Sequence, residues 1–392
     1  MIELGNLDDI VALRHDLHAH PETAYEEYRT AGIVAENLRS WGIEVHTGIA
    51  KTGLVGVLRR GSASRAIMLR ADMDALPMQE DNTFAHRSTH PGKMHGCGHD
   101  GHTAMLLAAA RHLARSGGFD GTVYFLFQPA EENGGAGARA MMREGLFERF
   151  PTDAVFGIHN WPGMSEGHVG VCPGPLMAAA NAFKITITGR GGHAAAPHHC
   201  ADPVPPLFAV GQAIQTILTR SKNPIDAAVI SITQVQAGGS VANIIPGSAW
   251  LGGAVRAYGP AVVDLIERRL NEMATAIAQA HDCRADVHFE RRYPAVINAE
   301  NETEFVLNVM REVVGEHKTH IIEPVMVAED FSFYLQKKPG CYFFLGAGDG
   351  EHRDAGHGLG PCALHNGSYD FNDRVIPVGV SLWIRLVQRF LA

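Results

Sequence analysis

The chain lacks long hydrophobic runs and an excess of basic residues. Its longest apolar stretches, such as AMLLAAA before Arg111, are far shorter than the ~20 residues that span a bilayer. The N-terminus carries early acids and no unbroken apolar signal segment. Lys and Arg number 33 against 42 Asp and Glu, which gives a formal net charge of -9. We therefore expect no membrane and no nucleic acid as partner, and a small or polar soluble molecule instead.

The six cysteines form no Cys-x-x-Cys pair, although the chain has 392 residues. In a protein of this length, scattered cysteines are typical of reduced, buried thiols, so we expect a cytoplasmic location. Neither a Gly-x4-Gly-Lys-Ser/Thr phosphate loop nor a His-Glu-x-x-His helix is present. What stands out instead is the number of histidines, 22 in all, and the segments in which some of them occur.

Hydrophobic patterns predict two domains of different fold. Helical and strand patterns alternate along residues 1–180, and buried strands are expected at 66–69, 122–127 and 154–158. This alternation favours an α/β domain with a mostly parallel mixed sheet covered by helices. Between 181 and 290 the order becomes βαββαβ, which is typical of a ferredoxin-like α+β module. The α/β pattern resumes over 291–392, so we predict a discontinuous catalytic domain with an inserted domain.

The clearest metal-type segment is His95-Gly-Cys97-Gly-His99-Asp100-Gly-His102. Its glycines allow a tight turn that brings Cys97 and His99 to one point, and thiolate with imidazole suits zinc or a similar transition metal. A polar loop that caps the next helix is the simpler interpretation. In that interpretation Asp100 is the candidate N-cap of the helix that follows.

A second segment, Gln128-Pro-Ala-Glu131-Glu132-Asn133, follows the apolar strand TVYFLF. Two adjacent carboxylates are costly there unless a cation or strong donors lie nearby. Side chains of neighbouring extended residues diverge, so we expect one carboxylate to bind metal and the other to accept a proton from water. A solvated acidic loop is the alternative.

Histidines and acids at other predicted strand ends extend this set. His159 follows a buried strand and His365 lies in Leu-His-Asn-Gly-Ser-Tyr. A lone histidine is more often structural, but together four loops supply a thiolate, three imidazoles and a carboxylate, enough for two metal ions. Asp72 and Asp74 could orient ligand histidines or could pair with Arg70. In the inserted domain, the Gly-flanked His193, Asn243 and Arg256 are weaker candidates for contacts with an anion or a carbonyl.

Taken together and in this order, the segments resemble the M20 metallopeptidase family. The motifs are RADMDALP, HGCGHDGHTAMLL, FQPAEENGGAGA, GIHNWP, GRGGHAAAPH and AEDFSFYL. The likeness is greatest to the amidohydrolase branch of hippurate hydrolases, N-acyl-amino-acid deacylases and plant auxin-conjugate hydrolases. It covers nearly the whole chain and implies a zinc-peptidase-like catalytic domain with an inserted lid and dimerisation domain.

The resemblance also implies roles for individual residues. It implies two divalent metal ions per subunit, held by five residues. The chemistry of these residues suits zinc because of the thiolate, and the imidazoles and the carboxylate also admit manganese, cobalt or nickel. Glu131 would be the general base, and His193 would stabilise the tetrahedral intermediate, often across a dimer interface. Asn243 and Arg256 would bind the substrate carboxylate. Apart from the resemblance, we expect Asp72, Asp74 and Asp100 to contact the ligand residues rather than the metal. The implied ligands are Cys97, His99, Glu132, His159 and His365.

The expected reaction is hydrolysis of an N-acyl amino acid to a carboxylic acid and a free amino acid, by a homodimer or a higher homo-oligomer. A dipeptidase or aminopeptidase with the same two-metal site is the nearest alternative. A non-catalytic metal-binding protein with a closed site is a third possibility. The adjacent Glu131 argues against it, since a closed site needs no spare base beside a ligand carboxylate.

Overall fold

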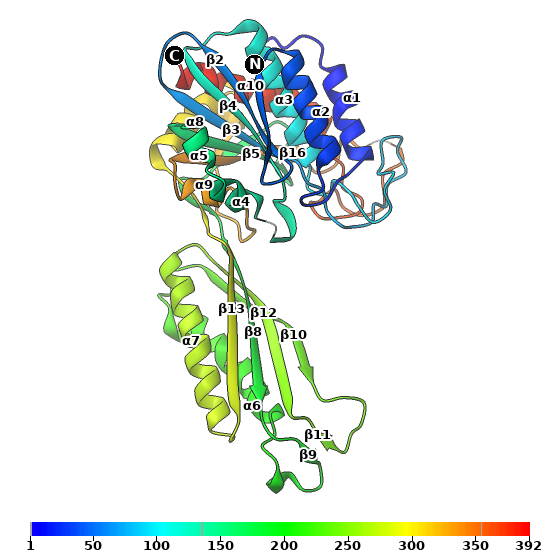
Figure 1. Ribbon diagram of the computed structural model, residues 1–392, viewed down its shortest axis with the longest axis vertical. Helices are drawn as coiled ribbons and strands as arrows, with labels where there is room; N and C mark the ends of the chain where they lie inside the picture. The colour runs from blue at the N-terminus through cyan, green and yellow to red at the C-terminus, as the bar shows by residue number, and fades with distance from the viewer. Residues whose placement is uncertain (1, 135, 354) are drawn as a thin grey trace. The chain divides into compact units, whose positions relative to one another are not determined.

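The computed structural model describes residues 2–134, 136–353 and 355–392, which form two compact units (Figure 1). Unit 1 comprises Met1–Leu176, Ile297–Glu323 and Asp330–Ala392. Unit 2 comprises Met177–Val296 and Pro324–Glu329. Each unit has its own hydrophobic core. Among the described residues, no helix combines the length and the apolar character needed to cross a bilayer.

Unit 1 is built on an eight-stranded mixed sheet in the order β1-β2-β4-β3-β5-β16-β6-β15. The central strands β4, β3, β5 and β16 are parallel to one another, as are β6 and β15, while the remaining neighbours are antiparallel. Every residue of β3 and of β16 is buried, as expected for strands covered on both faces. The strands are β1 (Glu44–Ile49), β2 (Gly53–Arg60), β3 (Ala66–Asp72), β4 (Gly121–Gln128), β5 (Ala154–Pro162), β6 (Val169–Val171), β15 (Thr319–Ile321) and β16 (Gly340–Gly348).

Helices cover this sheet, and α3 packs against α1, α2 and α10 over the main core. Figure 1 shows α1, α2 and α3 together on one side of the sheet, and α4, α5 and α9 elsewhere. The helices of unit 1 are α1 (Asp8–Ala19), α2 (Tyr28–Ser40), α3 (His99–Ser116), α4 (Gly137–Arg143), α5 (Leu146–Arg149), α8 (Glu300–Val314), α9 (Ser332–Leu335) and α10 (Ile376–Phe390).

The sheet order explains why distant motifs meet. Strands β4, β3 and β5 are parallel neighbours, with Asp72 opposite Gln128 and Arg70 opposite Gly157. Their C-terminal ends therefore lie at the same edge of the sheet, which is where open α/β sheets place ligands. The loops after β3 and β4, together with the end of β5, carry most of the predicted metal-binding residues.

Unit 2 is a ferredoxin-like module with the order βαββαβ. Its sheet is antiparallel, in the order β10-β12-β8-β13, and the inward residues of β8 pack with those of α6 and α7. The short strands β9 and β11 pair with each other, as do β7 and β14. Most residues of β7 (Gly174–Met177) and β14 (Val296–Asn298) belong to unit 1. The elements of unit 2 are β8 (Ala179–Thr188), β9 (Gly192–His193), α6 (Val204–Thr216), β10 (Ala228–Ala237), β11 (Ile244–Ile245), β12 (Ser248–Ala257), α7 (Pro260–Gln279) and β13 (Arg284–Tyr293). The predicted fold class is confirmed.

Candidate metal centre

All five predicted metal ligands lie in unit 1, in three overlapping groups. Within each group the candidate ligand atoms lie within 4.8 Å of one another. Cys97 Sγ is 3.4 Å from His159 Nε2, and His365 Nε2 is 3.1 Å from a Glu132 oxygen. Four of the five residues are buried, while the His365 side chain is 55% exposed. The groups are Cys97, His99 and His159; Cys97, Glu132 and His365; and His99, Glu131 and Glu132.

Backbone carbonyls orient two of the imidazoles. His99 Nδ1 lies 2.8 Å from the Asp74 carbonyl oxygen, and His159 Nδ1 lies 2.6 Å from the Asn160 carbonyl oxygen. A carbonyl only accepts, so each Nδ1 carries a proton, and in the neutral ring each Nε2 is then a free lone pair. His99 Nε2 is buried and has no hydrogen-bond partner among the described residues. Both rings thus present the nitrogen that a metal ion would bind.

The charges of the centre also fit a cation. Burial and the nearby Glu132 raise the pKa of the Cys97 thiol, so a positive ion would be needed to hold it as thiolate. Burial holds the pKa of His159 well below its usual range, which keeps the ring neutral and able to bind metal. Hydrogen bonds to Cys97 and Glu132 raise the pKa of His365 to about 10. The donor set of thiolate, imidazole and carboxylate therefore suits a transition metal.

Asp74 holds the turn that carries the two adjacent glutamates. Its Oδ1 accepts the Glu131 backbone N–H at 3.0 Å, and its Oδ2 accepts that of Glu132 at 2.9 Å. Its backbone carbonyl also orients His99, as described above. Asp74 thus touches residues of two different predicted ligand segments.

Asp72 forms the predicted ion pair with Arg70, but the ring that it orients is not one of the five predicted ligands. The carboxylate pairs with Arg70 Nη1 at 2.7 Å and accepts a hydrogen bond from His102 Nδ1 at 2.6 Å. The ring it orients is His102, whereas His99 Nε2 lies 3.6 Å from its Oδ2. The ion pair lowers the cost of burying the carboxylate, and its pKa lies well below the usual range despite burial, because of Arg70 and the neighbouring imidazoles.

The prediction that Asp100 caps the following helix is wrong. Helix α3 begins at His99, and its N-cap is Gly98, which has a left-handed φ of 90°. A Cβ at Gly98 would lie 2.4 Å from Asn160 Nδ2, so no other residue fits this turn. Asp100 lies in the first turn, where its buried carboxylate is 2.9 Å from both Arg14 Nε and His18 Nδ1. It links α1 to the segment that carries Cys97 and His99.

Sequence reasoning missed a second layer of polar residues. His102 Nε2 accepts the Asn160 backbone N–H at 3.0 Å, which places its proton on Nδ1, toward Asp72. Asn160 Nδ2 donates to the Cys97 carbonyl at 2.7 Å, and the Tyr369 hydroxyl donates to Asn160 Oδ1 at 2.6 Å. His102 lies in the same motif as His99, and Tyr369 follows His365 by four residues. Closeness in sequence to the predicted ligands could therefore have indicated these two residues.

The remaining three predicted residues lie in unit 2. His193, on β9, is exposed, and its Nδ1 accepts the Ala195 N–H at 3.0 Å, so its Nε2 carries the proton. Asn243 lies beside it, since its carbonyl accepts the Ala194 N–H at 3.0 Å. Arg256 is eight residues beyond Ser248, the β12 residue nearest β11, or about 26 Å along the strand. Unit 2 of one chain thus brings His193 and Asn243 together and leaves Arg256 apart.

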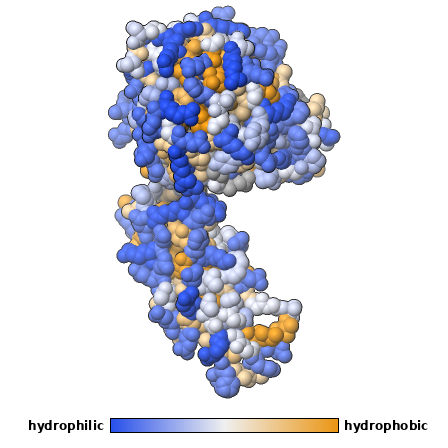
Figure 2. All heavy atoms as spheres, in the orientation of Figure 1, coloured by the Kyte–Doolittle hydropathy of each residue, from blue (hydrophilic) through white to orange (hydrophobic). Residues whose placement is uncertain are grey.

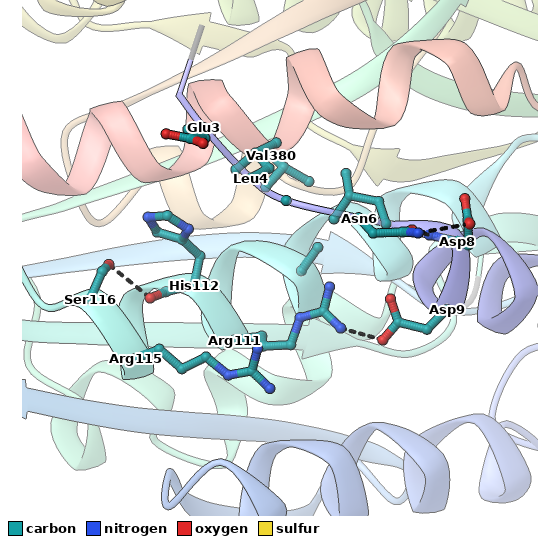
Figure 3. Close-up of a pocket in the computed structure, with 13 residues that line it drawn as sticks. Glu3, Leu4, Asn6, Asp8, Asp9, Arg111, His112, Arg115, Ser116 and Val380 are labelled. Carbon is teal, nitrogen blue, oxygen red and sulfur yellow. Dashed lines mark hydrogen bonds and ion pairs between the residues drawn. The ribbon is translucent and has the colours of Figure 1, made fainter.

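A separate hollow lies beside the N-terminal segment of unit 1. Figure 3 shows it between that segment and α3, with Arg111 reaching Asp9 and with His112 and Arg115 along one wall. Its volume is about 880 Å³, and none of the predicted site residues is among the described residues that line it.

The fold and the centre define a class: an α/β domain with a candidate metal centre at the carboxyl edge of its mixed sheet, interrupted in sequence by a ferredoxin-like module. The family model described as "Peptidase family M20/M25/M40" matches residues 68–389. The chain belongs to this family, and the predicted family is confirmed. It is a hydrolytic enzyme of the M20 amidase type, as the sequence predicts.

Relatives match along most of their length. The chain is 38% identical over 380 residues to a hippurate hydrolase of Campylobacter jejuni, covering 97% of this chain and 96% of the relative. It is 36% identical over 355 residues to the N-acetyl-L-cysteine deacetylase of Bacillus subtilis, covering 90% and 83%. A solved Bacillus subtilis structure, described as a dinuclear metal binding peptidase from the M20 family, matches with a TM-score of 0.84 at 30% identity, covering 98% of each chain.

Proposed function

We propose that this protein is a metal-dependent hydrolase that cleaves the amide bond of N-acyl amino acids, releasing a carboxylic acid and a free amino acid. The observation that carries the proposal is the placement of Glu131, which shares one group with the candidate ligands His99 and Glu132 and whose backbone N–H is held by Asp74. A site that only stored metal would not need this further carboxylate. The relatives named for hydrolysis of hippurate and of N-acetyl-L-cysteine support the substrate class.

Two divalent ions would be held by Cys97, His99, Glu132, His159 and His365. When bound, such ions lower the pKa of water toward neutrality and polarise the substrate carbonyl. The thiolate favours zinc, while the imidazoles and the carboxylate also admit manganese, cobalt or nickel. The solved relative described as dinuclear supports the number of ions.

The chain's own residues would move the proton and bind the substrate. Glu131 would take a proton from the attacking water and return it to the leaving amine. His193 would donate its Nε2–H to the developing oxyanion, which agrees with the tautomer that Ala195 imposes. Arg256 is half-buried, and it and Asn243 would bind the substrate carboxylate. Within one chain, Arg256 lies about 26 Å from the end of β12 near His193. We therefore propose that Arg256 and His193 of the same chain act in different active sites of a dimer.

The homodimer is proposed to form through the β10 edge of unit 2. This strand has one neighbour in the sheet and carries the exposed Val229 and Val235. Beside it, Phe208, 61% exposed, lines a groove of about 390 Å³ between α6 and the sheet. Figure 2 shows a hydrophobic patch over the loop that joins β10 to β11, where Val241 and Ile244 are exposed. An edge strand with apolar neighbours suits pairing with a second copy, and sedimentation of Phe208→Glu against wild type would test it.

Hydrolysis of free-amine peptides, by a dipeptidase or aminopeptidase using the same centre, is the competing function. The test is amino-acid release from N-acetyl, N-benzoyl and N-indoleacetyl amino acids and from a free dipeptide. The enzyme is stripped with a chelator and reloaded with zinc, manganese, cobalt or nickel. Metal-dependent release from a blocked substrate supports the proposal, whereas release from the dipeptide alone overturns it in favour of a peptidase.

A further inference from the structure

A second buried carboxylate, Glu27, holds the turn that carries Glu131. Glu27 lies just before α2, and its Oε1 accepts the Ala130 backbone N–H at 2.9 Å. With Asp74, it accounts for three successive backbone N–H groups, those of Ala130, Glu131 and Glu132. Each of these donates to the oxygen of a buried carboxylate rather than to a strand or a helix. The position of Glu131 is therefore set by side chains from two other segments.

Backbone geometry shows why this turn needs to be held. Ala130 has a φ of 53° and Tyr25, in the segment before Glu27, has a φ of 62°. Left-handed backbone is unfavourable for residues with a Cβ and persists where the surroundings impose it. Glu27 Oε1 accepts the N–H of Tyr25 as well as that of Ala130, each at 2.9 Å. One buried oxygen thus fixes both left-handed positions.

We propose that Glu27 is a positioning residue that sets the Pro129–Glu132 turn, and with it Glu131, for proton transfer. The inference rests on the proposed role of Glu131 as general base. Glu27 would not touch substrate, and it would act on Glu131 through the Ala130 N–H. Its other oxygen accepts the Thr52 hydroxyl at 2.5 Å, which fixes the carboxylate plane toward the turn.

Thr52 also determines which hydrogen bonds a neutral side chain at position 27 could keep. A backbone N–H can only donate, whereas the Thr52 hydroxyl can reverse and accept. A proton on Glu27 would therefore sit on Oε2, toward Thr52, and leave the bond to Ala130 in place. Glutamine reproduces this arrangement, with its amide oxygen toward Ala130 and its NH2 toward Thr52. Burial raises the pKa of Glu27 most, and Asp74 raises it further. The Thr52 hydroxyl and the backbone N–H groups that face the carboxylate, that of Ala130 among them, lower it.

The experiment compares three substitutions at Glu27 with one at its exposed neighbour. Glu27→Ala removes the acceptor, and Glu27→Asp keeps the charge but withdraws it by one methylene. Glu27→Gln keeps the acceptor without the charge. The control is Glu26→Gln, since Glu26 is exposed and pairs with Lys93. Measurements are kcat, KM, bound metal and amide hydrogen exchange of the segment 123–133.

For Glu27→Ala and Glu27→Asp we expect kcat to fall about 10–100-fold, the range typical of residues that support a catalytic group, with KM and metal content within about threefold. Glu27→Gln should stay within about threefold of wild type, and Glu26→Gln should be unchanged. Equal losses in Glu27→Gln and Glu27→Ala would overturn the proposal, as would a loss of metal that accounts for the lost activity.

Hydrogen exchange separates this proposal from the proposed function. Faster exchange of the 123–133 segment in Glu27→Ala than in Glu26→Gln is expected even if wild type hydrolyses none of the blocked substrates. Unchanged exchange would overturn the role of Glu27 whatever the activity. If the alanine variant fails to fold, Glu27→Asp gives the same comparison with a smaller change of volume.

Discussion

The two units present their candidate catalytic residues in opposite ways. In unit 1, Glu131 and four of the five candidate ligands are buried, and His99 and His159 are each fixed by a backbone carbonyl. In unit 2, His193 is exposed on a two-residue strand and is oriented by one hydrogen bond from Ala195. Groups that bind metal need a fixed lone pair in a dry site, whereas a group that donates a hydrogen bond to a substrate needs an accessible N–H. Substitutions in the two regions should therefore have different effects on kcat and on metal binding.

The largest effect is expected from Glu131→Gln, in the buried region. Glutamine has nearly the same shape, and Asp74 holds residue 131 through its backbone N–H, so the turn should remain in place. Loss of the base should lower kcat about 10²–10⁴-fold while metal content, measured by mass spectrometry of the metals, stays normal. Activity near that of wild type would show that another group takes the proton.

His193→Ala tests the exposed region. We expect kcat to fall about 10²–10³-fold, because a donor to the developing oxyanion is lost, with metal content and fold unchanged. If the residue acts across a dimer, mixing this variant with Glu131→Gln should restore activity. Random pairing of equal amounts makes half of the dimers mixed, each with one intact site, so about a quarter of the wild-type activity should return. Failure to complement, with exchange of subunits shown, would place His193 in its own chain's site.

The contrast also explains which residues of the candidate site could be predicted from the sequence. The five ligands lie at strand ends or in glycine-rich loops, and parallel strand order alone is enough to predict that such ends meet. The partner of Asp100 could not be predicted in this way, because Arg14 lies on a helix 86 residues upstream and reaches it only through packing of α1 on α3. Glu27 could not be predicted either. Its partner in the turn is a backbone N–H, which every residue type except proline has, so the sequence gives no signal for the contact. Residues that support a site through the backbone are therefore the hardest to predict from sequence.

A smaller effect is expected from Tyr369→Phe, which removes one hydroxyl from the second layer of the buried region. That hydroxyl orients Asn160, whose amide holds the Cys97 carbonyl. We expect metal affinity to fall about 10-fold, at the low end of the range for such supporting groups, with little change in folding. The measurement is competition with a chelating dye. Tyr28→Phe, at an exposed tyrosine, is the control, and equal affinities in the two variants would contradict the role of the network.

The smallest expected change concerns the stability of unit 1 and comes from Glu27, a buried carboxylate that forms no ion pair with the described residues. Burial raises the pKa of Glu27 from 4.5 to about 7, so the folded protein binds this proton more tightly than the unfolded chain. Its contribution to stability is thus present below pH 4.5 and is lost as the pH rises through 7. Relative to wild type, metal-free Glu27→Gln should gain stability over this interval, by about 3 kcal/mol at most. Urea unfolding at pH 5 and pH 8 measures the difference. Glu26→Gln should not reproduce the gain, because the hydrogen bond from Lys93 lowers the pKa of Glu26, and an equal gain in both variants would show that it does not come from Glu27.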